Sequence, residues 1–220
     1  MYRYILFDLD GTLTDSREGI FKSVRYSLEK LGRPCPSYET LLRFVGPPLQ
    51  DSFECYCGMD QEEAWHAVEV FRERYETIGW AENKAADGIV ELMSRLKERG
   101  CVLAIASSKP ERSVVPIAEK FGFTPYLSAA CGSEGKNEAK VDVIRSAFVR
   151  LGIGEAEKAE TVMVGDRKFD VEGAAECGIP CIGVELFDFA PPGEMAASGA
   201  LAVCKTVQEL EEALLNGGVR

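Results

Sequence analysis

The sequence contains a single histidine, His66, among its 220 residues, and this scarcity argues against several kinds of catalytic site. We expect neither a Ser-His-Asp nor a Cys-His catalytic pairing, because the one histidine lies in a charged stretch typical of a solvated helix surface. The eight cysteines show no CxxC spacing, which argues against a structural zinc site. We therefore expect reduced thiols, as in the cytoplasm, and a chemistry based on carboxylates and hydroxyls.

Long apolar runs and an excess of positive charge are also missing. No apolar stretch approaches the ~18 residues of a membrane span, and Asp8 and Asp10 interrupt the apolar start too early for a signal peptide. The net charge of −11 argues against a nucleic-acid surface, which needs a basic face. These absences predict a cytoplasmic protein whose partner is neither a membrane nor a nucleic-acid polymer. An anionic substrate would have to be attracted by local cations, because the overall field repels it.

An acidic pair follows the first apolar stretch of the chain. Tyr2–Phe7 is rich in aromatic and branched residues, as buried strands are, and Asp8-Leu9-Asp10-Gly11-Thr12 comes directly after it. Carboxylates beside a hydrophobic strand are costly to bury unless a positive group meets them. Gly11 allows a sharp turn and a close approach of the backbone to a ligand. The pattern indicates a Mg²⁺ and phosphate site at the end of a strand, with a simple turn as the alternative.

Residues 15–82 show helical periodicity throughout and contain no strand pattern. The helical segments are separated by breaks, of which Gly46-Pro47-Pro48 is the clearest. This stretch stands between one strand and the next. We therefore expect two domains: an all-helical cap formed by residues 15–82, and a core formed by residues 1–14 and 83–220.

From residue 87 onward, helical and apolar segments alternate. Cys101–Ala106, Thr161–Val164 and Pro180–Val184 are continuous apolar runs, which are typical of parallel strands covered on both faces. Weaker strand signals lie at 126–131 and 201–203. The alternation predicts an α/β fold with a doubly wound parallel sheet, whose ligands bind at the carboxyl ends of the strands.

Polar side chains follow three of the predicted strands, and in a parallel sheet these strand ends lie at one edge. Carboxylate oxygens are the ligands that Mg²⁺ prefers, while a Lys and a Ser hydroxyl suit the oxygens of a phosphate. These polar residues are Asp8 and Asp10, then Ser107, Ser108 and Lys109, then Asp166 and Asp170.

In this order the segments resemble the four motifs of the haloacid dehalogenase superfamily, and the helical insert resembles its C1-type cap. The resemblance covers essentially the whole chain. Within the superfamily, Phe44–Leu49 and Met163–Arg167 are most similar to phosphoglycolate phosphatase-like and 5′-nucleotidase-like members. The resemblance implies a Rossmann-like core, Mg²⁺ as cofactor, and hydrolysis of a small phosphorylated metabolite such as phosphoglycolate or a nucleoside 5′-monophosphate.

The resemblance also implies residue roles. Asp8 would form an aspartyl-phosphate, Asp10 would protonate the leaving alcohol and then activate water, and Ser107 would contact the phosphate. Either Lys140 or Lys136 would be the lysine of the third motif, and Lys140 is favoured because it directly precedes an apolar helix. The expected metal ligands are Asp8, Asp10, Asp166 and Asp170, and the expected substrate-binding residues are Gly11, Thr12, Ser108, Gly46 and Arg43.

One segment departs from the pattern of relatives, which often have a Gly-rich loop after the fifth strand. Here residues 185–192 are bulky and aromatic, and we expect them to narrow the site or to pack on the cap. The cap is expected to select the substrate and to exclude water on closing. The state of assembly is left open between monomer and homodimer.

The alternatives are a phosphomutase, a haloacid dehalogenase and a non-enzymatic phosphoacceptor domain. Asp10 argues against a dehalogenase, because that reaction has no leaving alcohol to protonate. The helical insert and the acidic pair on the first strand argue against a phosphoacceptor domain.

Overall fold

The computed structural model describes residues 1–134, 139–187 and 189–217. The chain divides into two compact units, a core unit of Met1–Thr14 with Ala85–Arg220 and a helical unit of Asp15–Lys84. The chain passes between the units through two short strands, β2 (Thr14–Asp15) and β3 (Lys84–Ala85), which pair with each other. The second boundary therefore lies slightly later than the expected one after residue 82.

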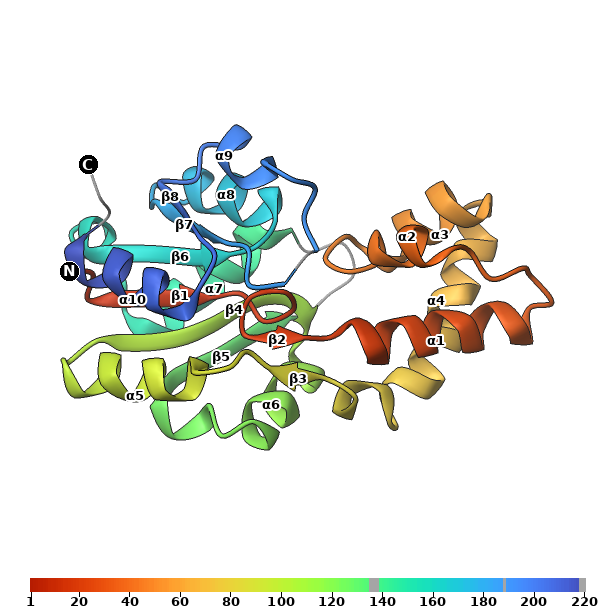
Figure 1. Ribbon diagram of the computed structural model, residues 1–220, viewed down its shortest axis with the longest axis horizontal. Coiled ribbons are helices and arrows are strands. Elements are labelled where there is room, and N and C mark those ends of the chain that lie inside the picture. Colours follow the sequence, from red (N-terminus) through yellow and green to blue (C-terminus); the bar gives the residue numbers. More distant parts are fainter. Residues whose placement is uncertain (135–138, 188, 218–220) are drawn as a thin grey trace. The chain divides into compact units, whose positions relative to one another are not determined.

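Within the described residues, the core unit is built on a six-stranded sheet with the order β5-β4-β1-β6-β7-β8 (Figure 1). Every pair of neighbouring strands is parallel, which confirms the prediction of a parallel α/β sheet. The strands are β1 (Tyr4–Phe7), β4 (Val102–Pro110), β5 (Leu127–Ser133), β6 (Thr161–Gly165), β7 (Cys181–Val184) and β8 (Ala202–Cys204).

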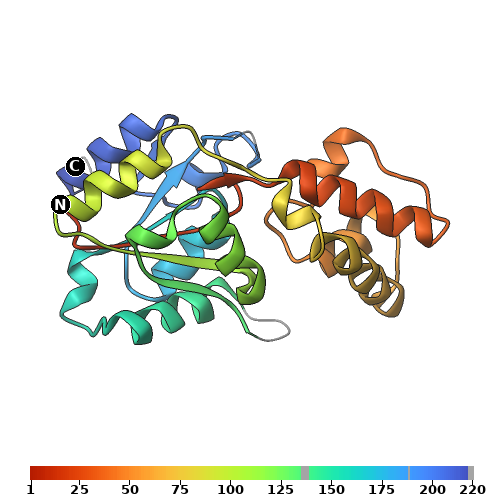
Figure 2. The same ribbon diagram turned by 90° about the horizontal axis from the view of Figure 1, so that it is seen from below.

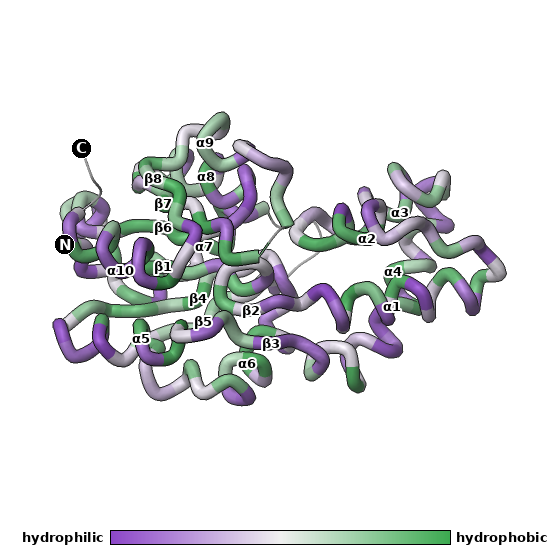
Figure 3. Tube along the Cα trace, in the orientation of Figure 1, coloured by the Kyte–Doolittle hydropathy of each residue, from purple (hydrophilic) through white to green (hydrophobic). Residues whose placement is uncertain are grey.

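Strand β1 lies between β4 and β6, and Tyr4 pairs with Val102 on one side and with Thr161 on the other. All four residues of β1 are buried, and the tube of Figure 3 is hydrophobic along β4 and β6. The order of the strands reverses at β1. In open α/β sheets a crevice forms at this point, outside the carboxyl ends of the strands, and ligands bind there.

Helices cover both faces of the sheet (Figure 2). Helices α7 and α8 pack on the face that carries Leu6, Ala104 and Met163, while α5 and α10 contact each other on the opposite face. Fully burying a side chain such as Leu6 or Met163 contributes about 1.5–3 kcal/mol. The helices of the core unit are α5 (Ile89–Glu98), α6 (Glu111–Lys120), α7 (Lys140–Leu151), α8 (Lys168–Glu176), α9 (Glu194–Ala197) and α10 (Val207–Asn216), with 3₁₀ turns η2 (Thr124–Tyr126) and η3 (Glu157–Glu160).

Strand β4 is longer than the apolar run that predicts it. It continues past Ala106 because Pro110 pairs with Ser133 of β5, across an irregular stretch of register. Ser107, Ser108 and Lys109 therefore lie within the strand and not after it. Their burial alternates as expected for a strand: Ser107 is buried, Ser108 is exposed, and the side chain of Lys109 is again buried.

Helix α8 begins at Lys168. The backbone N–H of Arg167 donates to Asp170 Oδ2 over 3.0 Å, so the carboxylate caps the first turn of its own helix. Helix α7 begins at Lys140, and Asn137, whose residue type favours helix N-caps, lies outside the described residues. In the part of the chain that the structure describes, every helix is too short or too polar to cross a lipid bilayer.

The helical unit contains α1 (Arg17–Lys30), α2 (Tyr38–Leu42), α3 (Leu49–Cys57), α4 (Gln61–Tyr75) and the 3₁₀ turn η1 (Gly79–Ala81). Helix α4 packs against both α1 and α3, and Ser27 Oγ donates to Ala67 O over 2.7 Å between α1 and α4. A capping box opens α4. The N–H of Glu63 donates to Asp60 Oδ1 over 2.9 Å, and the N–H of Asp60 donates to Glu63 Oε2 over 3.2 Å.

Candidate active site

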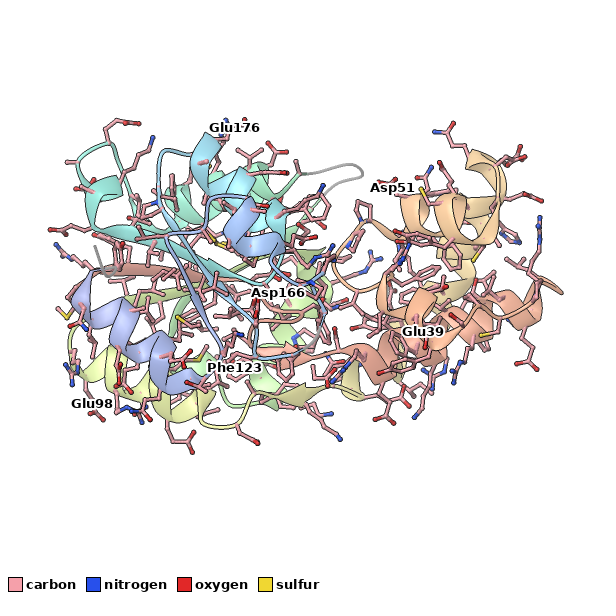
Figure 4. All side chains as sticks on the ribbon, turned by 45° about the horizontal axis from the view of Figure 1, so that its top comes forward. Glu39, Asp51, Glu98, Phe123, Asp166 and Glu176 are labelled. Atoms are coloured by element: carbon pink, nitrogen blue, oxygen red, sulfur yellow. The ribbon has the colours of Figure 1, made fainter. Side chains whose placement is uncertain are left out.

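Three carboxylates meet at the carboxyl ends of β1 and β6. Asp8 follows β1, Asp166 follows β6, and Asp170 lies in the first turn of α8; one oxygen of each lies within 4.8 Å of the others. Asp166 is labelled in Figure 4 in the core unit. All three residues are buried, with exposed fractions of 8%, 1% and 2%. Buried charges of one sign this close together repel strongly, so the cluster requires positive charge.

Lys140 supplies part of this positive charge. Its Nζ lies 2.5 Å from Asp8 Oδ1 and 2.7 Å from Asp170 Oδ1, and it donates to Ala106 O over 2.8 Å. The stem of Lys140 passes close to Gly173 of α8, where an added Cβ would lie 3.0 Å from Lys140 Cγ. The first residue of α7 thus reaches both carboxylates across a small residue on α8.

The pKa values show that one ammonium does not balance the cluster. Burial raises the pKa of Asp8 to about 6, although the Lys140 charge opposes the shift. Burial and the charges of Asp170 and Asp8 also raise the pKa of Asp166 well above its usual range. Burial alone would lower the pKa of Lys140, but the charges of Asp170 and Asp8 raise it overall, so Lys140 stays an ammonium. The three carboxylates therefore keep an excess of negative charge beside Lys140, which a second cation would neutralise.

The donor set of the cluster fits Mg²⁺. Asp166 Oδ2 is buried and has no hydrogen-bond partner among the described residues. Carboxylate oxygens are hard ligands of the type that Mg²⁺ takes, and a buried oxygen without a donor is a costly arrangement that a cation would relieve. The residues present are therefore suited to hold a divalent cation.

Gly11 and Thr12 shape the position of Asp166. Gly11 has φ +88°, and an added Cβ would lie 2.1 Å from Asp166 Oδ2, so only glycine fits here. The Thr12 hydroxyl donates to Asp166 Oδ1 over 3.2 Å, and the N–H of Gly11 donates to Thr14 O over 2.8 Å. Both residues were expected to contact the substrate. The Gly11 N–H is thus bonded within its own loop and the Thr12 hydroxyl is bonded to the carboxylate after β6, and the contact of both residues with a substrate stays a prediction.

The carboxylate of Asp10 stands apart from the three-carboxylate cluster. Its Oδ2 accepts a hydrogen bond from Lys109 Nζ over 2.6 Å, and its Oδ1 is buried without a partner among the residues described. The acidic cluster found contains the carboxylates of Asp8, Asp166 and Asp170 but not that of Asp10, and Asp10 as a metal ligand stays a prediction.

The two serines of β4 have different surroundings. Ser107 is buried, and its Oγ accepts a long hydrogen bond of 3.4 Å from the N–H of Lys109. Ser108 is exposed, on the opposite side of the strand. Ser107 is thus placed at the carboxyl end of β4 beside β1, whereas the side chain of Ser108 is directed away from that face.

The remaining sequence-predicted residues lie elsewhere. Arg43 and Gly46 are exposed and belong to the helical unit, where the Arg43 guanidinium lies 5.6 Å from the centroid of the Tyr56 ring. Their contact with a substrate stays a prediction. Lys136, the alternative lysine of the third motif, lies outside the described residues.

The aromatic segment after β7 contributes a contact that sequence reasoning left open. An added Cβ on Gly11 would lie 2.6 Å from Phe189 Cδ2, so the Phe189 ring covers this part of the acidic loop. Phe189 is buried and stacks with Phe187 at a centroid distance of 5.6 Å. The segment thus packs beside the carboxylates, and its aromatic composition was the only sequence signal for this contact.

Glu194 of α9 is a residue that sequence reasoning missed. Its Oε1 accepts from Arg167 Nε over 2.8 Å and from the N–H of Lys168 over 3.1 Å. Burial alone would raise the pKa of Glu194, but the hydrogen bonds from Arg167 and Lys168 lower it overall. This contact holds the segment between Asp166 and Asp170 in place. A four-residue helix after two prolines has no periodicity by which Glu194 could have been found.

Comparison with known proteins agrees with this geometry. The family model described as haloacid dehalogenase-like hydrolase matches residues 5–184. The chain is 40% identical over 215 residues to a 5′-nucleotidase of Pseudomonas aeruginosa, covering 97% of this chain and 96% of that protein. It is 36% identical to the tyrosine-protein kinase PtkA of Mycobacterium tuberculosis, covering 96% of this chain and 72% of the kinase.

Two further matches cover most of the chain. A phosphoglycolate phosphatase of Pseudomonas fluorescens is 30% identical over 82% of this chain and 68% of its own length. The crystal structure of a predicted phosphatase from Clostridium acetobutylicum superposes with a TM-score of 0.90 at 42% identity, covering 98% of this chain and 99% of that one. The match over residues 5–184, together with relatives aligned over nearly the whole chain, shows that the protein belongs to the haloacid dehalogenase-like hydrolases.

Proposed function

We propose that the chain is a Mg²⁺-dependent phosphatase that hydrolyses a small phosphomonoester through an aspartyl-phosphate. The observation that carries the proposal is the buried cluster of Asp8, Asp166 and Asp170 with one lysine, which retains the negative charge to hold a divalent cation. The names of the similar phosphatases support the same reaction class.

In the first step, Asp8 attacks phosphorus while the bond from phosphorus to the leaving oxygen breaks, and Asp10 gives its proton to that oxygen. In the second step, a water molecule attacks phosphorus, its proton goes to Asp10, and the bond to Asp8 breaks to release inorganic phosphate. Lys140 holds Asp8 throughout, and Ser107 binds a phosphoryl oxygen in this proposal.

Mg²⁺ would be held by Asp8 and Asp166, with Asp170 as a further ligand or as their partner, and when bound it would neutralise charge on the phosphoryl group. Thr12 and Gly11 keep Asp166 oriented for this task. Asp170 in turn is kept in place by its bond to the N–H of Arg167.

The substrate classes that we propose are phosphoglycolate and nucleoside 5′-monophosphates, which are the ones suggested by the names of similar proteins. Arg43 and Gly46 of the helical unit, with the backbone near Ser108, are proposed to contact the rest of the substrate. We also propose that the protein acts in the cytoplasm, as a monomer or a homodimer.

A panel of phosphomonoesters with Mg²⁺ or with EDTA tests the function. We expect Mg²⁺-dependent release of inorganic phosphate, and loss of at least about tenfold in turnover in Asp8→Asn, because tenfold corresponds to about 1.4 kcal/mol of transition-state stabilisation. Asp51→Asn is the matched control, since Asp51 is an exposed aspartate of the helical unit (Figure 4).

Four results would contradict the proposal. Equal rates with Mg²⁺ and with EDTA would show that the reaction needs no divalent cation. Retention of more than about a tenth of the wild-type rate in Asp8→Asn would show that Asp8 is not the nucleophile. Transfer of phosphate from ATP to a peptide tyrosine, without release from any ester, would favour the activity named for the relative PtkA. An isomerised sugar phosphate without free phosphate would favour a phosphomutase.

A further inference from the structure

Lys109 and Asp10 form a buried ion pair beside the three-carboxylate cluster. Lys109 Nζ lies 2.6 Å from Asp10 Oδ2, and the two side chains are only 8% and 13% exposed. Lys109 reaches this position because β4 continues past Ala106, which places Ser107 and Lys109 on the same face of the strand. The proposed steps use Asp10 but give Lys109 no part.

The two oxygens of Asp10 have different surroundings. Oδ2 accepts from an ammonium, which has only donors to offer, so a proton on this oxygen would compete with the ion pair. Oδ1 is buried and has no hydrogen-bond partner in the described part of the chain. Oδ1 is therefore the oxygen better suited to carry a proton, and a buried polar atom without a partner is consistent with a place where a reacting group is received.

We propose that Lys109 is a positioning residue for proton transfer, which holds Asp10 by Oδ2 and so presents Oδ1 to the leaving oxygen and then to the attacking water. The inference rests on the proposed function. As the bond from phosphorus to the leaving oxygen breaks, that oxygen takes its proton from Asp10 Oδ1. In the second step, Oδ1 recovers a proton from the water that attacks phosphorus.

The dependence of the rate on the leaving group tests this role, because proton donation matters most when the leaving group is a strong base. The probes are p-nitrophenyl phosphate, whose leaving group needs no proton, and ethyl phosphate, whose leaving group needs one. In Lys109→Met we expect kcat/KM for ethyl phosphate to fall at least about tenfold further than kcat/KM for p-nitrophenyl phosphate.

The second step gives an independent readout with p-nitrophenyl phosphate. Since water activation also needs Oδ1, the aspartyl-phosphate should accumulate in Lys109→Met, and p-nitrophenol should appear in a burst equal to the enzyme concentration. Lys109→Arg, which keeps a cation at this place, should restore part of the ethyl phosphate activity and reduce the burst.

A double-mutant cycle with Asp10→Asn guards against a variant that fails to fold. Lys109→Met with Asp10→Asn removes both charges of the pair, and we expect it to be no slower on ethyl phosphate than Asp10→Asn alone. Lys158→Met is the matched control, because Lys158 also lies 2.6 Å from a carboxylate, that of Glu155, but on the surface. Its two rates should stay at the wild-type values.

Two outcomes would overturn the role of Lys109. Equal losses of kcat/KM on the two esters without a burst would indicate phosphate binding or a structural contribution, and additive losses in the cycle would indicate that Lys109 acts apart from Asp10. If the wild-type protein hydrolyses neither ester nor any member of the phosphomonoester panel, it is the proposed function that fails.

Discussion

Lys140→Met removes the ammonium that holds Asp8 and Asp170, and its effect on stability can be worked out from the structure. The variant keeps the length of the side chain but deletes contacts of 2.5 Å and 2.7 Å to two buried carboxylates and one of 2.8 Å to Ala106 O. Breaking a buried ion pair from one side costs about 3–5 kcal/mol, because the other charge stays buried without its partner.

For a chain of this length, each kcal/mol lowers Tm by about 2–4 °C, so we expect Lys140→Met to melt about 10 °C below the wild-type protein in EDTA near pH 8. The destabilisation should shrink toward pH 5. Without Lys140 the pKa of Asp8 rises further above its present value of about 6, and the carboxyl then takes up a proton in the folded state.

Thermal denaturation followed by circular dichroism, with EDTA or with Mg²⁺, measures these shifts. Mg²⁺ should raise the Tm of the variant more than that of the wild-type protein, because it binds a cluster that now has no other cation. Lys158→Met, which deletes a surface pair worth about 0–1 kcal/mol, should change Tm by only a few degrees. If Lys140→Met melts as close to wild type as this control does, the ammonium is not what holds the carboxylates together.

Two further predictions concern the acidic loop and its charge. Gly11→Ala should lower the apparent Mg²⁺ affinity, read from Tm and from activity, by at least about tenfold, because the new Cβ would lie 2.1 Å from Asp166 Oδ2. Gly100 has a similar φ of +84° but open space around it, so Gly100→Ala should show only the backbone cost of about 1–2 kcal/mol. Unchanged Mg²⁺ affinity in Gly11→Ala would show that Asp166 does not depend on this glycine. In EDTA, the free energy of unfolding of the wild-type protein should rise by about 1.3 kcal/mol as the pH falls from about 7 to about 5, because Asp8 has a pKa of about 6 in the fold against an ordinary value of 3.8, so the folded state takes up more protons than the unfolded chain over this range. Urea denaturation at each pH checks this, and a slope of the opposite sign would contradict the burial of Asp8 as a charged group; saturating Mg²⁺ should flatten the profile.

The strands that the sequence predicts most clearly are those with continuous apolar runs, because burial on both faces leaves no polar position in them. The weaker signals at 126–131 and 201–203 also correspond to strands, β5 and β8. Once the strands are parallel, their carboxyl ends must share an edge, so the meeting of Asp8 and Asp166 could be inferred from residues far apart in the chain. Local spacing also favoured Lys140 over Lys136.

The pair of Lys109 with Asp10 could not be predicted in this way. It depends on the extension of β4, which arises from pairing with β5 and not from any apolar pattern of its own. The contact of Phe189 with Gly11 and the hydrogen bond from Arg167 to Glu194 likewise depend on the path of the proline-containing segment after β7. That segment shows no hydrophobic periodicity from which these contacts could be predicted.

The central position of β1 has a consequence for how the protein is made. Strand β1 precedes both of its hydrogen-bonding neighbours in the chain, which begin at Val102 and Thr161. The helical unit lies between these segments in the sequence and packs through contacts among its own residues, so it can fold before the neighbouring strands of β1 have been synthesised. Assembly of the sheet is therefore a late event governed by long-range contacts, which slow folding. A chain interrupted before β6 lacks Asp166, so a partly synthesised molecule cannot complete the cluster of three carboxylates.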